Sequence, residues 1–463
     1  MGLINFLKGV WSRVFPTKLR SIKNALNIDI ALTDEMLKSI DVWQNSYSGR
    51  ALWLDEYHVV SLRLEKSIVR EFSNVSLSEM TSSVSYKPLD EIYKKAIRNI
   101  NTHFQRGLAT GAMIIKPLGG SKVQFVSANA FIPVEYDTDG RLIKVIFPEF
   151  KKLGNKFYTR LEYHDLDKDK GLTITNSAYV SDSESTLGNK IPLSSIEEWA
   201  DLEESITYPT MNKTAFGYYR NPIDNDIDGS MTPISVFDSA LPIIQIADIQ
   251  FGRLDWEFES GERAIHIDES ALKGNRVAKL NKRLYRSVDL DDNEGILQDY
   301  SPTIRQVDIK AGLEAYKREI EFSVGLAYGD LSDPATVAKT ATEIKSAKDR
   351  KYNTVNAIQE NLKDCMEDLV YALAFYNSMT TSGYKFVCDF KDSIKTDEET
   401  ERKQDIQDLN LGILRPEEYR AKWMGEDIDT ALQNLPQKAE VIEWVVQLLL
   451  QQLFVLQLLY WLL

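Results

Sequence analysis

The chain has 463 residues, of which 43% are hydrophobic and 27% charged, and its formal net charge is −14. This composition excludes a disordered chain and is typical of a globular protein with two or three domains. The negative charge argues against a surface that wraps nucleic acid throughout. It permits a protein that surrounds DNA and lets it slide, because dense phosphate pairing would hold the duplex still.

The residues that usually mark enzymes and metal sites are sparse and scattered. Cys365 and Cys388 form no CxxC motif, so neither a disulfide framework nor a zinc site is indicated. Four histidines stand far apart, and the chain has no Walker A motif. We therefore expect no catalytic residues and no cofactor.

The first half of the chain changes its hydrophobic period near residue 109. Residues 22–109 have helical periodicity, with predicted helices at 32–43, 55–72 and 89–107. Between residues 109 and 208 the period becomes two, and predicted strands are separated by Gly, Asp and Asn turns. This pattern predicts an α+β fold with an antiparallel β-rich subdomain embedded in helices.

The second half is dominated by long helical segments. A predicted helix at 233–258, with Pro242 near its first turns, is followed by a compact segment and a second helix at 309–327. A short loop then leads into a predicted helix of unusual length, 336–378. Its later half has an apolar seam that predicts burial against neighbours: Val355, Ile358, Leu362, Met366, Leu369 and Leu373. Its first half is basic, which predicts exposure to water.

The sequence GLAYGDLSDPATVAKTATEIKSAKDRKY, above all Lys339 to Ile344, resembles the corresponding region of tailed-bacteriophage portal proteins. The helix at 233–258 is similar to their first stem helix. The resemblance implies the portal fold, with a helical stem, a β-rich wing, a small α/β clip, a long kinked helix and a helical crown. The implied parts are 1–232 (N-terminal helices and wing), 233–261 (first stem helix), 262–308 (clip), 309–328 (second stem helix), 329–337 (tunnel loop), 338–378 (long helix), 379–440 (distal wing and crown) and 441–463 (apolar C-terminal helix).

The resemblance also implies a function that is mechanical rather than catalytic. Portal proteins form a homo-dodecameric ring at one capsid vertex of the virion, after assembly in the host bacterial cytoplasm. The ring is a channel for dsDNA during packaging and ejection. Expected partners are the terminase large subunit, the major capsid and scaffold proteins and the head-completion or neck adaptor. No stable membrane contact is expected.

Two sets of residues are candidates for contacts with DNA or partners. The tunnel loop would place Asp330, Ser332, Asp333 and Thr336 at the narrowest point, with Lys339, Lys345 and Lys348 as phosphate contacts. Acidic groups that repel the backbone would offset the attraction of the lysines and ease sliding. The alternative for the lysines is an ordinary solvated helix face.

The second set is a basic run with no acidic residue between 270 and 288, in an acidic chain. Attraction to phosphates or to an acidic partner is one interpretation, and a solvated amphipathic helix is the other. The resemblance places the run in the clip. Its cationic residues are Lys273, Arg276, Lys279, Lys282, Arg283 and Arg286.

An acidic loop imitates part of a calcium-binding motif. Asp224, Asp226 and Asp228, followed by Gly229, match positions one, three, five and six of an EF-hand. Position twelve is Ser235, where a bidentate Glu is needed. The loop is therefore a weak calcium candidate, and a solvated turn is the alternative.

The segment Val441 to Leu463 departs from the portal pattern because it is almost entirely apolar. Its 23 residues are long enough to span a bilayer. However, Glu443, Gln447 and Gln451 form one polar stripe, and no basic cluster flanks the segment. It is compatible with a buried crown helix, with a tail foreign to the natural protein, or with a membrane anchor. The last case would make the chain a membrane-anchored adaptor or pore protein.

Overall fold

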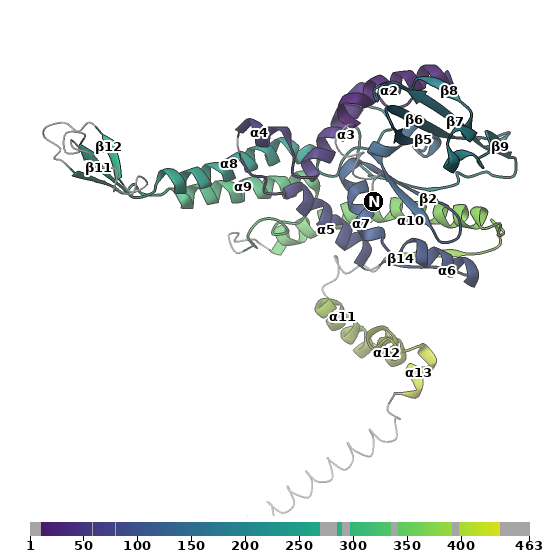
Figure 1. Ribbon diagram of the computed structural model, residues 1–463. Helices are drawn as coiled ribbons and strands as arrows, with labels where there is room; N and C mark the ends of the chain where they lie inside the picture. Colours follow the sequence, from purple (N-terminus) through teal and green to yellow (C-terminus); the bar gives the residue numbers. More distant parts are fainter. Residues whose placement is uncertain are drawn as a thin grey trace, which may run out of the picture. The chain divides into compact units, whose positions relative to one another are not determined.

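The computed structural model describes residues 11–57, 59–78, 80–268, 285–288, 297–334, 341–390 and 398–435. It divides into two compact units, Met1–Lys391 and Asp392–Leu463. The first unit combines helices with sheets whose strands are mostly antiparallel (Figure 1), which confirms the α+β class. In the second half, helices at 241–260, 306–324 and 341–376 follow one another in the expected order.

The N-terminal part of the first unit is helical, but two of its predicted helices are wrong because each is divided. The segment 55–72 breaks between α4 and α5, where the backbone N–H of Leu62 donates to the Asp248 carboxylate (2.7 Å) and Arg63 has a φ of +59°. This bond holds the segment between α4 and α5 against the helix that contains Asp248, so one continuous helix cannot form here. The helices are α2 (Trp11–Leu26), α3 (Asp34–Tyr47), α4 (Leu52–Tyr57), α5 (Leu64–Ser78), α6 (Lys87–Ala96) and α7 (Ile100–Thr110).

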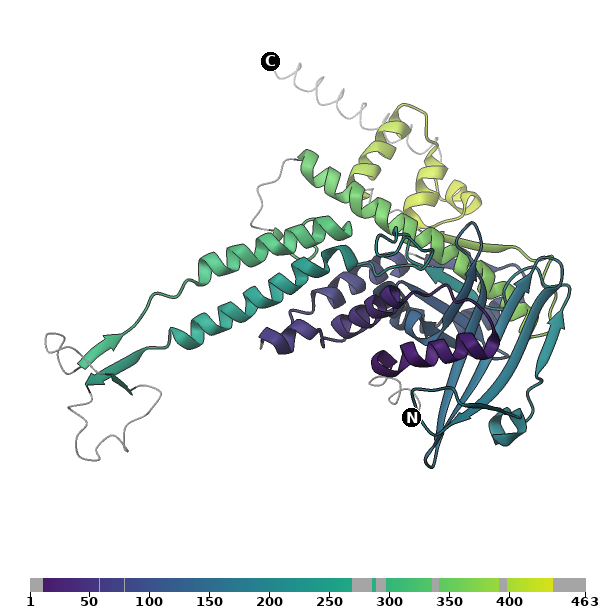
Figure 2. The same cartoon turned by 90° about the horizontal axis from the view of Figure 1, so that it is seen from above.

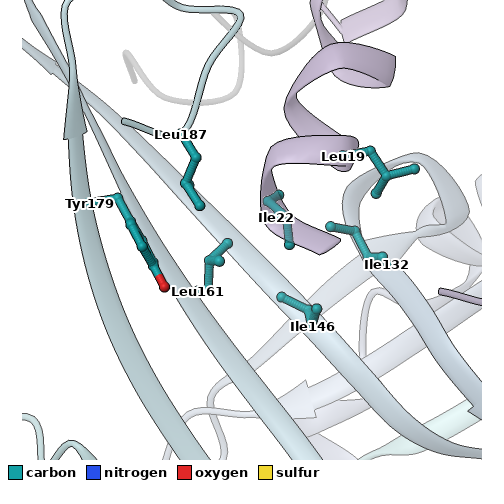
Figure 3. Packing of buried hydrophobic residues seen from close by; sticks show 7 residues of the cluster. All are labelled: Leu19, Ile22, Ile132, Ile146, Leu161, Tyr179 and Leu187. Carbon is teal, nitrogen blue, oxygen red and sulfur yellow. The ribbon is translucent and has the colours of Figure 1, made fainter. Parts of the chain in front are cut away.

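The largest sheet has the strand order β4-β5-β6-β7-β8, and β9 also pairs with β7. All its neighbouring strands are antiparallel, which confirms the prediction from the period of two. In Figure 3, Leu19 and Ile22 of α2 pack against Ile132, Ile146 and Leu161 of the sheet. The strands are β4 (Ile132–Tyr136), β5 (Leu142–Leu153), β6 (Lys156–Asp167), β7 (Gly171–Ser181), β8 (Asn189–Ile191) and β9 (Ser205–Tyr208).

Two smaller sheets complete the β structure of this region. One has the order β10-β2-β3, with β2 (Ala112–Pro117), β3 (Val123–Ser127) and β10 (Gly217–Arg220). The other pairs β1 (Met80–Val84) with β14 (Phe386–Phe390). None of the strands expected from the period of two includes β1, whose partner is about 300 residues away.

A group of charged side chains is buried between β2 and β6. Lys116 of β2 pairs with the Glu162 carboxylate, which also accepts from Arg160 (3.1 Å) and contacts His164 Nε2 (2.8 Å). Burial alone would raise the pKa of Glu162, but Lys116 and His164 outweigh it and hold that pKa far below its usual value. Burial lowers the pKa of Lys116 in turn. Each charge depends on its partners.

The helices α8 (Leu241–Ser260) and α9 (Gln306–Val324) run antiparallel, side by side (Figures 1 and 2). Pro242 lies in the first turn of α8, where proline fits a helix. At the far end of this hairpin, β11 (Ala264–Asp268) pairs with β12 (Tyr285–Val288) and with β13 (Leu297–Tyr300). The hairpin therefore carries a small three-stranded sheet at its tip.

The long helix is α10 (Ala341–Tyr376), which has 36 residues. All six residues of its predicted seam are at most 1% exposed. They pack α10 against α5, α6, β2 and β10. The prediction of a buried later half is confirmed.

The second unit contains α11 (Glu398–Asn410), α12 (Pro416–Met424) and α13 (Ile428–Gln433). Polar contacts join its helices: Trp423 Nε1 and Lys422 both bind the Asp405 carboxylate, at 2.8 and 2.7 Å. Within 402–435, only Ala431 is buried.

A buried carboxyl group lies where α3 and α5 meet. Glu65 of α5 is 1% exposed and accepts a hydrogen bond from the Ser46 hydroxyl. Its other oxygen, Oε2, is buried without a hydrogen-bond partner. Burial, with a smaller contribution from Asp248 of α8, raises the pKa of Glu65 to about 7. The Arg63 guanidinium opposes this shift only in part.

This geometry predicts a pH-dependent stability. A carboxyl group with a pKa raised on folding stabilises the fold fully below its unfolded pKa, near 4.5, and that stability is lost as pH rises through 7. The shift corresponds to about 3 kcal/mol in unfolding free energy. Glu65→Gln should remove this pH dependence in urea unfolding between pH 4.5 and 8. The exposed Glu56→Gln is the control, and an unchanged pH dependence in Glu65→Gln would contradict the assignment.

Candidate functional site

The loop between α9 and α10 is built around the carboxylate of Glu321. This side chain is fully buried near the end of α9. It accepts hydrogen bonds from the backbone N–H groups of Gly329 (3.1 Å), Leu331 (2.6 Å) and Ser332 (2.7 Å) and from the Ser332 hydroxyl (2.9 Å). A carboxylate with several donors makes strong, charge-assisted bonds. Residues 325–334 are therefore fixed from inside the protein.

The loop starts at a glycine that no other residue could replace without strain. Gly325 ends α9 with a φ of +82°, in the left-handed region. A Cβ at this position would lie 2.4 Å from the Thr354 hydroxyl of α10. The close approach brings the end of α9 directly against the long helix.

Asp330 joins the loop to two helices. Its carboxylate accepts from the Ala327 N–H (2.9 Å) and lies 3.0 Å from Lys351 Nζ of α10. Lys351 also pairs with Glu71 of α5 at 2.7 Å. Burial raises the pKa of Asp330. Burial lowers the pKa of Lys351, but the hydrogen bonds and charges of Glu71 and Asp330 outweigh this effect, so the pKa of Lys351 is raised.

Arg350 holds the loop on its other side. Its guanidinium donates to the Leu326 carbonyl (3.2 Å) and lies over the rings of Phe322 (4.8 Å) and Tyr328 (5.1 Å). Such cation–π contacts favour a fixed position for both the rings and the charge. The loop base is thus clamped between α9 and α10.

The structure separates the predicted tunnel-loop residues by environment. Ser332 is 5% exposed and Asp330 is mostly buried, whereas Asp333 is exposed and its N–H donates to Glu314 (2.7 Å). Lys348 is exposed on α10. Thr336 and Lys339 lie outside the described residues, and Lys345 is described only as part of the α10 backbone. Asp330 and Ser332 therefore act as internal supports.

The last four residues of the predicted basic run, 285–288, form β12 at the tip of the α8–α9 hairpin. Arg286 belongs to β12, opposite His266 of β11. Within the described strands, Arg263 and Asp299 form an ion pair at 2.9 Å that ties β13 to the start of β11. The other cationic residues of the run lie outside the described part of the chain: Lys273, Arg276, Lys279, Lys282 and Arg283.

The acidic loop is held by hydrogen bonds within the loop and by one from Thr33. Asp228 accepts from the Thr33 hydroxyl (2.6 Å) and the Ser230 N–H (2.9 Å), which outweigh its burial and lower its pKa. Asp224 and Asp226 are exposed. Among the described residues, no group of three or more acidic, histidine or cysteine side chains is placed to hold a metal ion. Asp228 instead ties the loop to Thr33, the residue that caps the start of α3.

The sequence did not single out the residues that fix the loop, Glu321, Arg350 and Lys351. A signal for Glu321 was present, because it stands between Ile320 and Val324, which are apolar and buried. A charged residue at such a place needs partners. The loop that follows α9 offers the required N–H donors.

Comparisons with known proteins do not identify the chain. No protein-family model matches it, and no curated protein sequence matches it. Among the helices of the described residues, none combines the length and the apolar character that a membrane span requires. The apolar segment Val441 to Leu463 lies outside those residues.

Proposed function

We propose that this chain is the portal protein of a tailed phage or of a related phage-derived particle. The observation that carries the proposal is one run of elements: α8, a small tip sheet, α9, a loop fixed from inside and the 36-residue α10. This is the order of stem helix, clip, stem helix, tunnel loop and long helix implied by the sequence resemblance. The sheet β4–β9 corresponds to the wing in that comparison.

In this proposal the fixed loop base positions the channel-lining part. Glu321 and Lys351 hold residues 325–334, so that the segment after Ser332 extends from a rigid support. The exposed Asp333 and Lys348 would face DNA together with Thr336, Lys339 and Lys345. In a ring, each subunit would contribute both acidic and basic side chains, and the repulsion and attraction of the DNA phosphates would partly cancel, which lowers the electrostatic barrier to the sliding of DNA. Portal proteins neither cut nor join DNA, so positioning is their mechanism.

The proposed surroundings follow from the same comparison. A ring of twelve copies would occupy one vertex of the capsid, with scaffold and major capsid proteins around it. The tip sheet and its basic run would contact the terminase large subunit during packaging and the neck adaptor afterwards. Positive charge suits acidic partner surfaces and DNA phosphates alike.

Electron microscopy tests the proposal directly. A chain lacking 441–463 should form rings with a central channel in negative stain, and mass photometry should give about twelve times the mass of one chain. The full-length chain should give the same particles without added membranes. A monomer at every concentration, also after co-expression with the scaffold and capsid proteins of the same particle, would contradict the proposal.

A further inference from the structure

A short segment between α3 and α5 leaves the N-terminal helices and lies on α8. We call this segment, residues 51–62, the clasp, and the structure describes all of it except His58. The clasp contains α4, which contacts α8 (Figure 1). Its attachment therefore decides how firmly the first helix of the hairpin is joined to the N-terminal helices.

Two features of α8 receive the clasp. The Asp248 carboxylate accepts hydrogen bonds from Trp53 Nε1 (2.9 Å) and from the Leu62 N–H (2.7 Å), so it binds both ends of the clasp. One helical turn later, Gly252 leaves a notch, because a Cβ at this position would lie 2.3 Å from Val59 Cγ1. Val59 therefore fills space that α8 provides only because it has a glycine there.

The base of the clasp is closed by contacts between the residues that flank it. The Arg63 guanidinium donates to the Tyr47 carbonyl (3.1 Å), and the Ser46 hydroxyl donates to the Glu65 carboxyl group. Ser46 is fully buried and Glu65 is 1% exposed. The other oxygen of Glu65, Oε2, is buried without a hydrogen-bond partner. The base of the clasp thus contains a carboxyl group whose charged form lacks sufficient partners.

The groups around Glu65 favour its neutral form. Burial is the main cause of its raised pKa, and Asp248 of α8 adds a like charge, which the Arg63 guanidinium offsets only in part. Burial also raises the pKa of Asp248. Ionisation of Glu65 puts a second negative charge into a buried region that already holds Asp248. Opening of the clasp would give both carboxylates access to water.

The other charged groups beside this end of α5 act elsewhere. On α7, Arg106 acts on Tyr47, whose pKa it lowers against the larger effect of burial. On α10, Lys351 pairs with Glu71, further along α5. Both acidic residues of α4 are exposed to solvent. The principal charges that act on Glu65 are therefore those of Asp248 and Arg63.

We propose that the clasp is a pH-sensitive fastening of α8, which is closed while Glu65 is protonated and opens when Glu65 ionises. The closed clasp holds α8 to the N-terminal helices through Asp248 and the notch at Gly252. The open clasp releases this contact, so that the α8–α9 hairpin is joined less firmly to those helices. This behaviour is a property of the single chain and does not depend on the proposed function.

The direction of the pH effect follows from the two states of Glu65. Burial raises the pKa of Glu65 from 4.5 to about 7 in the closed clasp, and the pKa returns toward 4.5 when opening exposes the group to water. Closure is therefore most favoured below pH 4.5 and weakens as pH rises through 7. Between pH 5 and 8 the equilibrium constant for opening should increase roughly tenfold to hundredfold.

Hydrogen exchange of the full-length chain measures this opening. Protection factors, which correct for the intrinsic effect of pH on exchange, are compared for peptides that cover 51–62 and β6. Between pH 5 and 8, the protection of the clasp should fall by the factor given above. Glu65→Gln should remove this change. His58→Asn removes the other group of the clasp that titrates in this range and should leave the change as it is.

Substitutions at the notch test the closure itself. In Gly252→Ala the new Cβ meets Val59, so the protection of the clasp at pH 5 should fall roughly tenfold or more while β6 stays protected. Adding Val59→Ala removes the nearest atom and should restore most of the protection. Gly312→Ala in α9 is the matched control, because its Cβ would meet only Gln250 Nε2, at 3.9 Å, and should change nothing.

Three results would overturn the proposal. Equal protection of the clasp and of β6 at every pH would mean that the clasp opens only when the whole unit unfolds. An unchanged pH dependence in Glu65→Gln would assign the effect to another group. A clasp that stays protected in Gly252→Ala would show that the notch does not fasten it. None of these results concerns ring formation, so each would leave the proposed function standing.

Discussion

Glu321→Ala is expected to lower the free energy of unfolding of the first unit by about 3–5 kcal/mol, because it leaves three N–H groups of the loop and the buried Ser332 hydroxyl without their acceptor. The amides of Gly329, Leu331 and Ser332 should then exchange with solvent much faster than in the unsubstituted chain. Urea unfolding gives the first quantity, and hydrogen exchange gives the second.

Two matched variants isolate the role of the carboxylate. Glu321→Gln keeps one oxygen for the three N–H groups, while its NH2 group replaces the oxygen that accepts from the Ser332 hydroxyl and can donate to that hydroxyl instead, so its cost should be about 1 kcal/mol. Glu319→Ala removes an exposed carboxylate two residues away and should change stability by less than about 0.5 kcal/mol. If Glu321→Ala behaved like Glu319→Ala, the loop would not depend on this anchor.

Glu162→Gln is expected to cost about 3–5 kcal/mol at pH 7, because it leaves the buried Lys116 ammonium without its partner. The pKa of Lys116 is already lowered by burial, so the variant should regain stability as pH rises toward 10.5 and Lys116 loses its proton. Urea unfolding of the variant from pH 7 to 10 measures both effects.

A double variant checks that the cost comes from an unpaired charge. Lys116→Met combined with Glu162→Gln removes both charges and should be less destabilising than Glu162→Gln alone. Glu198→Gln is the surface control: it breaks the pair with Lys151, but the Glu198 side chain is 68% exposed, so its cost should be far smaller than that of Glu162→Gln. Equal losses in the single and double variants would exclude the unpaired charge as the cause.

The parts of the fold that could be predicted are those governed by local patterns. The alternation along β5, β6 and β7 reflects a sheet with one face against the core, and glycine and aspartate turns mark its ends. The seam of α10 repeats every three or four residues because one face is buried along its whole later half. In both cases the neighbours in sequence are also neighbours on one surface.

The parts that could not be predicted depend on distant partners. The short, polar β1 is a strand because β14 supplies its hydrogen-bond partners, and the sequence around β1 contains no hydrophobic pattern that predicts this pairing. The division between α4 and α5 follows from a bond between Leu62 and Asp248, nearly two hundred residues apart. Secondary structure here is decided by tertiary contacts.

The candidate site divides in the same way. The loop and its charged residues could be found from sequence, since turn residues stand before a long helix. The environments of these residues could not be predicted. Asp330 pairs with Lys351, and Lys351 also pairs with Glu71 of α5, which lies about 260 residues before Asp330. Because these residues lie far apart in the sequence, the sequence alone does not show which charged side chains are exposed and which pair with one another.

The pairing of β1 with β14 has a consequence for how the protein is made. Roughly 300 residues separate these strands, and translation at about 5–20 residues per second takes about 15–60 s to cover that distance. Throughout that time β1 has no partner, and the surfaces later covered by α10 remain open on the nascent chain. The first unit can reach its final form only after residue 390 has left the ribosome, so protection from aggregation must come from elsewhere during synthesis.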